Sequence, residues 1–96
     1  MEVMYKFKMI NYQWDAEVNF FCVVDVESLP KKGQSVSPDN ENEYEVERVE
    51  DNTIGSGVDY IVHLSPWDRF TANDDDYWQE TVWSMCECGW KLRYGA

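Results

Sequence analysis

Hydrophobic and polar residues alternate near the start of the chain, which is typical of β-strands with one buried face. Between residues 3 and 9 every odd position is apolar, and Lys6 and Lys8 stand between them. A second alternation runs from 18 to 26, after a stretch, NYQWDAE, that has the composition of a turn or short loop. We therefore predict that the two segments form an antiparallel pair of strands.

Further strands are predicted in the middle of the chain. The segment 30–38 holds two prolines and a glycine, so it reads as a connection rich in turns, with a short strand at Val36. Alternation resumes in EYEVERVE at 43–50, where Val49 falls out of phase and indicates a bulge or a strand end. The next alternation covers 58–64 and predicts another strand.

The period becomes helical in the last quarter of the chain. Asn73 is the predicted N-cap, and the acids at 74–76 occupy the first turn, at the positive end of the helix dipole. Gly89 is placed for a left-handed C-terminal cap, and 90–94 alternate again as a final strand. At 100° per residue one arc of this helix collects the apolar side chains, namely Trp78, Val82, Met85 and Cys86.

These elements predict a single α+β domain that spans residues 1–96. We expect a mainly antiparallel β-sheet of four to six strands with one C-terminal helix packed on it. The alternative architecture is a small β-barrel with the helix as a lid. No motif marks a second domain, an internal repeat or a linker.

Charge is the property in which this chain differs most from an ordinary domain. Nineteen acids and eight bases give a formal net charge of -11. Fourteen of the acids lie between 39 and 87, where Arg48 and Arg69 are the only bases. Nucleic acids and anionic membranes bind positive protein surfaces, so this balance argues against both as direct ligands. A partner is expected to be a basic protein.

Two ordered rows of acids are predicted. The strand row consists of Glu43, Glu45 and Glu47, which alternate with Tyr44 and Val46. On a strand these carboxylates project from one face at intervals of about 6.6 Å, a spacing broadly similar to that of successive phosphates on a DNA strand. Ordinary solvent exposure explains alternating Glu equally well, so the row is a hypothesis about a binding surface.

The helix row consists of Asp76, Glu80, Trp83 and Glu87, in which the three acids lie within about 40° of each other, opposite the apolar arc, and Trp83 lies on their side. Trp is enriched at binding hot spots, and acids with aromatics suit an Arg-rich partner. Together with the first helical turn, the two rows give the predicted partner-binding residues: Glu43, Glu45, Glu47, Asp74, Asp75, Asp76, Glu80, Trp83 and Glu87.

The sequence offers little support for catalysis or metal binding. Cys86 and Cys88 would point about 200° apart on a helix, and a lone His63 has no catalytic companion nearby in sequence. We therefore expect no enzyme activity, no cofactor and no metal. Three cysteines without framework spacing, no apolar segment of membrane-spanning length and no leader-like N-terminus favour a cytoplasmic protein.

In composition and size the chain resembles phage-encoded counter-defence proteins, such as anti-CRISPR or anti-restriction DNA mimics. This likeness implies a small acidic inhibitor that acts in the host cytoplasm and blocks a nuclease or a CRISPR surveillance complex. Two alternatives remain open: an adaptor or immunity-type module that binds through the acidic and aromatic patch around Trp83, and a structural domain whose charge only serves solubility. A homodimer is compatible with each.

Overall fold

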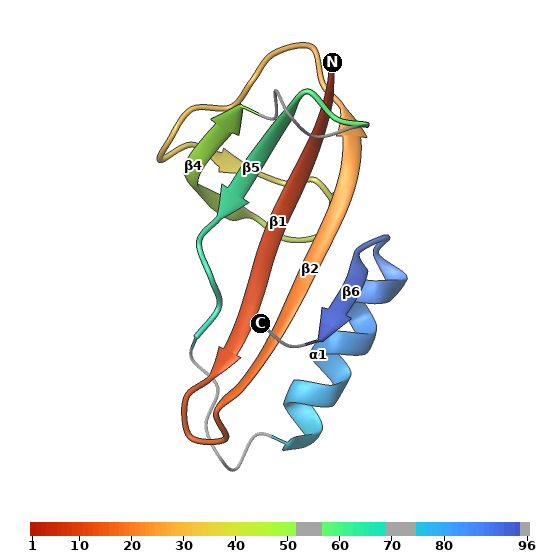
Figure 1. The fold of residues 1–96 in the computed structure, drawn as a ribbon. Helices are drawn as coiled ribbons and strands as arrows, with labels where there is room; N and C mark the ends of the chain where they lie inside the picture. The colour runs from red at the N-terminus through yellow and green to blue at the C-terminus, as the bar shows by residue number, and fades with distance from the viewer. Residues whose placement is uncertain (52–56, 69–74, 95–96) are drawn as a thin grey trace.

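The computed structural model describes residues 1–51, 57–68 and 75–94. Six strands and one helix follow each other along the chain (Figure 1). The elements are β1 (Glu2–Asn11), β2 (Ala16–Asp25), β3 (Ser35–Val36), β4 (Tyr44–Asp51), β5 (Tyr60–Leu64), α1 (Asp75–Glu87) and β6 (Lys91–Tyr94). The predicted α+β class is thereby confirmed, with each predicted strand and the helix in its expected place.

All six strands join one mixed sheet in the order β3-β4-β5-β1-β2-β6. The sheet is not closed into a barrel, because β3 and β6 form its two edges, and the barrel alternative is wrong. β1 and β2 pair antiparallel from Glu2↔Asp25 to Asn11↔Ala16, as the alternation predicts. The bulge expected near Val49 is present as a register shift between Val46 and Arg48.

The pairing between β1 and β5 is parallel, which the local pattern does not reveal. Val3 lies opposite Tyr60 and Lys6 lies opposite His63. A parallel neighbour requires a long crossover, and between β1 and β5 the chain runs through β2, β3 and β4. As a result β1 sits in the middle of the sheet, with β5 on one side and β2 on the other.

One face of the sheet carries the hydrophobic core. The odd-numbered residues of β1 from Val3 to Met9 are at most 4% exposed, whereas Lys6 and Lys8 on the other face are exposed. Phe7 lies at the centre of an aromatic cluster, with ring centroids 4.8–5.7 Å from four partners. These partners are Phe20, Tyr44, Trp67 and Trp90.

Helix α1 covers part of this core face and begins near the turn between β1 and β2 (Figure 1). Trp78 packs edge-on against Trp14 of that turn, with centroids 6.2 Å apart. Further along the helix, the Met85 sulfur lies 3.3 Å from the Tyr44 hydroxyl of β4. The apolar arc of the helix is therefore directed at the sheet, and its opposite side faces solvent.

The C-terminal end of α1 has the predicted glycine cap. Gly89 has φ 101°, a left-handed conformation that favours glycine. The Trp90 amide donates to the Met85 carbonyl and the Gly89 amide donates to the Cys86 carbonyl, which is the hydrogen-bond pattern of a Schellman motif. The reversal directs Trp90 into the core and starts β6. The predicted N-cap Asn73 lies outside the described residues.

Among the described residues, none of the helices is both long enough and apolar enough to cross a membrane.

Candidate interaction surfaces

The strand row has the alternation that the sequence predicts. Tyr44 and Val46 are 2% and 1% exposed, while Glu43, Glu45 and Glu47 are all exposed. Since successive side chains of a strand point to opposite faces, Glu45 lies on the face of β4 that is turned away from the core and α1. These three carboxylates are therefore accessible to a partner.

The bulge in β4 interrupts the strand row after Glu47. Arg48 follows Glu47 on the face of the sheet that is turned away from the core and α1, which we call the open face. It lies opposite His63 of β5. Glu50 Oε2 accepts a hydrogen bond from His63 Nε2 at 2.9 Å and lies 3.8 Å from the Arg48 guanidinium. The hydrogen bond with His63 lowers the pKa of Glu50. The strand row is therefore short, and the cationic side chain of Arg48 follows at its end.

The helix row lies on the solvent side of α1. Glu80, Trp83 and Glu87 follow each other at i, i+3 and i+7, and all three are exposed. Trp83 is 69% exposed, whereas Trp78 on the buried side of the same helix is 5% exposed. The helix contains four acids and no base. This surface is uniformly acidic and carries a large accessible aromatic side chain.

The predicted residues of the first helical turn are placed only in part. Asp75 and Asp76 belong to α1, but their side chains lie outside the described part of the structure. Asp74 lies outside the described residues altogether. The described helix row therefore rests on Glu80, Trp83 and Glu87.

The strand row and the helix row lie on opposite sides of the sheet. Tyr44 contacts Met85 of α1 through its core face, and Glu45, the next residue, points the other way. The six-stranded sheet separates the two rows, so a single flat partner surface cannot contact both at once. This arrangement divides the predicted acidic surface into two independent candidates.

Asp39 belongs to neither row, although a continuous strand would have added it to the strand row. Its Oδ1 accepts from the Glu41 and Asn42 amides, both at 3.0 Å, and its Oδ2 accepts from Tyr44 Oη at 2.8 Å and Trp90 Nε1 at 2.9 Å. Burial alone would raise the pKa of Asp39, but these hydrogen bonds outweigh it and lower the pKa to about 2. Asp39 is therefore a structural anchor for the connection that leads into β4.

The cysteines differ in part from the sequence expectation. Cys86, expected in the apolar arc, is exposed, whereas Cys88 packs against the core. The reason is that α1 ends at Glu87 and the cap at Gly89 turns the chain inward, which carries Cys88 towards the sheet. Burial raises the pKa of the Cys22 thiol to about 11. Within 1–51, 57–68 and 75–94, no group of three or more His, Cys, Asp or Glu could hold a metal ion.

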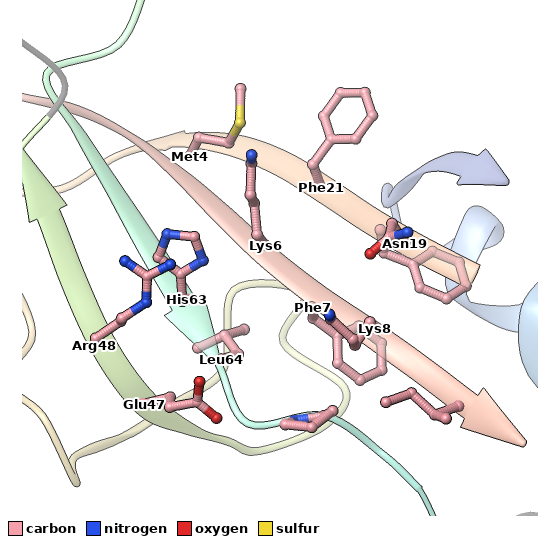
Figure 2. A pocket seen from close by; sticks show the side chains of 13 residues that line it. Met4, Lys6, Phe7, Lys8, Asn19, Phe21, Glu47, Arg48, His63 and Leu64 are labelled. Atoms are coloured by element: carbon pink, nitrogen blue, oxygen red, sulfur yellow. The ribbon is translucent and has the colours of Figure 1, made fainter. Parts of the chain in front are cut away.

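The open face of the sheet also carries a groove, which the sequence pattern does not predict (Figure 2). This open-face groove has a volume of about 760 Å³ and includes Lys6, Lys8, Arg48, His63 and Phe21 in its lining. The alternation of Lys6 and Lys8 with core residues is the one local signal for it. The rest depends on strand pairing, because Arg48, His63, Lys6 and Phe21 come from four different strands.

Comparison with known proteins adds no functional assignment to these surfaces. No protein-family model, curated protein or solved structure matches the chain.

Proposed function

We propose that the protein is a small non-enzymatic inhibitor that occupies the basic groove of a nucleic-acid-binding protein, and that it docks through the helix row. The observation that carries this proposal is the 69% exposure of Trp83 between Glu80 and Glu87 on a helix without bases. A nuclease or another enzyme with an Arg- and Lys-rich channel has the complementary chemistry.

Charge and shape favour the helix row over the strand row. The 13-residue helix is about 20 Å long, and the exposed Glu80 and Glu87 flank Trp83 on its solvent side, so this side presents a negative surface to a groove. Arg side chains can pair with the carboxylates and stack on the indole of Trp83. Salt bridges at a solvent-exposed surface contribute little to affinity, and the exposed indole adds apolar contact area that they do not supply.

Glu87 supports a binding role because its position opposes helix stability. It lies in the last turn of α1, where the helix dipole is negative and where no basic residue is present. A carboxylate there is unfavourable for the isolated fold. A basic partner would remove this repulsion on binding, so the unfavourable charge is explained if the surface is used.

The strand row is a second candidate, in which Glu43, Glu45 and Glu47 imitate a short run of phosphates. Their exposure beside the short edge strand β3 favours this possibility. Against it, Arg48 and Lys6 lie on the same face of the sheet and weaken the negative field. The helix row has no such neighbour within α1.

Affinity capture from a bacterial lysate tests the proposal. The immobilised protein is exposed to lysate at low and at high salt, with and without competing duplex DNA, and captured proteins are identified by mass. We expect a basic nucleic-acid-binding protein that is released by salt and by DNA. Trp83→Ala should abolish its capture. Tyr77→Ala is the matched control, because Tyr77 is a second exposed aromatic of α1 on another side of the helix.

The outcomes separate the alternatives. Capture that survives Trp83→Ala but is lost in a Glu45→Lys, Glu47→Lys variant would move the interface to the strand row. Capture that requires Trp83 but ignores DNA would indicate an adaptor without nucleic-acid mimicry. Absence of any partner under both salt conditions would refute the proposal and leave the acids as a solubility feature.

A further inference from the structure

The open face of the sheet carries a basic row that runs across five strands. In the strand register Arg48 lies opposite His63, His63 opposite Lys6, Lys6 opposite Phe21, and Phe21 opposite Lys91. Residues directly opposite each other in a sheet project from the same face and have neighbouring side chains. Figure 2 shows Lys6 rising between His63 and Phe21, with Arg48 beside His63.

On this face the cations gather in the groove, whereas the exposed carboxylates Glu43, Glu45 and Glu50 are not part of its lining. The lining of the open-face groove includes the cations Lys6, Lys8 and Arg48 and one carboxylate, that of Glu47. The whole chain has nineteen acids and eight bases. The lining holds three cations and one acid, while Glu17 and Glu50, which are not part of the lining, pair with Lys8 and Arg48.

The cations of the groove are only partly neutralised by neighbouring acids. Lys8 pairs with Glu17 at 3.3 Å, and Arg48 lies 3.8 Å from Glu50, which also binds His63. Lys6, in the middle of the row, makes no salt bridge within the described residues. An exposed ammonium group beside an accessible aromatic ring is thus available at the centre of the groove.

Apart from Asn19 and His63, the remaining lining is apolar, which restricts the class of ligand. Met4, Ile10, Phe21 and Pro66 contribute hydrophobic surface next to the cations. A volume of about 760 Å³ is within the range of small-molecule sites, which combine apolar walls with a few polar groups. A flat ring can lie against Phe21 while an anionic group is held by Lys6 and Arg48.

We propose that the open-face groove binds a small organic anion with a flat aromatic ring, of the kind that a mononucleotide presents. The net charge of -11 opposes a long nucleic acid strand, whose many phosphates would extend over the acidic surroundings. A single phosphate contacts only the basic row. One accessible aromatic in the lining, Phe21, also suits one base better than a stacked series.

Isothermal titration calorimetry with adenosine monophosphate tests this site, with inorganic phosphate, adenosine and a single-stranded oligonucleotide as comparison probes. We expect the nucleotide to bind in the micromolar range and each fragment to bind more weakly. Lys6→Gln removes a charge-assisted contact and should weaken binding about tenfold or more. Phe21→Leu should weaken binding of the nucleotide but not of phosphate. Lys31→Gln, an exposed cation outside the groove, is the matched control.

Any of four results would overturn the proposal. They are no binding at millimolar nucleotide, equal binding of phosphate and nucleotide, tighter binding of the oligonucleotide, and equal losses of affinity in Lys6→Gln and Lys31→Gln. Lys6 is exposed, so its substitution is not expected to affect folding, and circular dichroism verifies this. Trp83→Ala should leave nucleotide binding unchanged, because α1 lies on the other face of the sheet. A negative result for nucleotide binding in the groove can therefore be distinguished from a negative result for partner capture through the helix row.

Discussion

Replacement of Asp39 by Asn is expected to destabilise the fold because it removes Oδ2 as a hydrogen-bond acceptor. Asp39 Oδ2 accepts hydrogen bonds from Tyr44 Oη and Trp90 Nε1, while Oδ1 accepts from two backbone amides. An amide group can keep Oδ1 as an acceptor but places an NH2 group where Oδ2 was. The Tyr44 hydroxyl can reverse and accept from it, but the indole N–H of Trp90 can only donate. Trp90 is 3% exposed, so water cannot replace the lost partner.

The magnitude follows from the pKa and from the orphaned donor. A fall in the pKa of Asp39 from 3.8 to about 2 corresponds to about 2.4 kcal/mol at full weight. The carboxylate is only partly buried, so solvent screening reduces this to about 1 to 2 kcal/mol. An unsatisfied buried donor costs about 1 to 3 kcal/mol. Because the two effects overlap, we expect Asp39→Asn to lower the free energy of unfolding by about 2 to 3 kcal/mol.

Urea unfolding followed by Trp fluorescence measures this difference, with Asp51→Asn as an exposed control that should change stability by less than about 0.5 kcal/mol. A lowered pKa stabilises the folded state above the ordinary pKa, and this contribution disappears as pH falls. The gap between wild type and Asp39→Asn should be largest above pH 3.8 and shrink as pH falls towards 2. In a Trp90→Phe background, which lacks the donor, Asp39→Asn should cost less. Equal midpoints for wild type and Asp39→Asn near neutral pH would refute the reasoning.

Three further expectations concern the helix and the cysteines. Glu87→Lys should raise the free energy of unfolding by about 0.3 to 1 kcal/mol, because a cation suits the C-terminal end of the helix dipole, and should weaken partner capture; a loss of stability in urea unfolding would contradict this. Gly89→Ala should cost about 1 to 2 kcal/mol in the same assay, because φ of 101° is unfavourable for a residue with a Cβ; an unchanged midpoint would exclude strain at the cap. Iodoacetamide should modify exposed Cys86 well before Cys22, whose pKa is about 11. Mass spectrometry of peptides measures the order of modification, and modification of Cys22 first would contradict this expectation.

Local patterns were sufficient to predict the elements of this fold. Residues 3–9 alternate because one face of β1 is buried, and the same rule locates β2 and β4. Gly89 marks the end of α1 because its left-handed conformation favours glycine. Even the bulge in β4 is visible as the phase shift at Val49. Each of these features depends on residues that are close together in the sequence.

Features that depend on distant pairing could not be predicted in this way. The parallel contact of β1 with β5 joins Lys6 to His63, which lie far apart in the sequence. No local pattern in the sequence encodes that neighbour. The basic row on the open face could therefore not be predicted from a chain whose net charge is negative. The anchoring role of Asp39 is hidden from local patterns for the same reason, because its partner Trp90 is distant in the chain.

The helix row and the open-face groove lie on opposite faces of the sheet, which has a consequence for function. The helix row is acidic and lies over the core face, whereas the open-face groove is basic and lies on the other side. A basic partner bound to α1, as proposed, would leave the groove accessible. Substitutions at Trp83 and at Lys6 should act independently, since they share no contact and lie on opposite faces.

Displacement of labelled duplex DNA from the captured partner tests the proposed inhibition most directly. The protein is titrated into a preformed complex of that partner with DNA, and fluorescence anisotropy follows release of the DNA. We expect complete release by wild type and by Tyr77→Ala, and none by Trp83→Ala at the same concentration. If the DNA remains bound while the protein also binds, the helix row does not occupy the nucleic-acid groove, and the proposed inhibition is wrong.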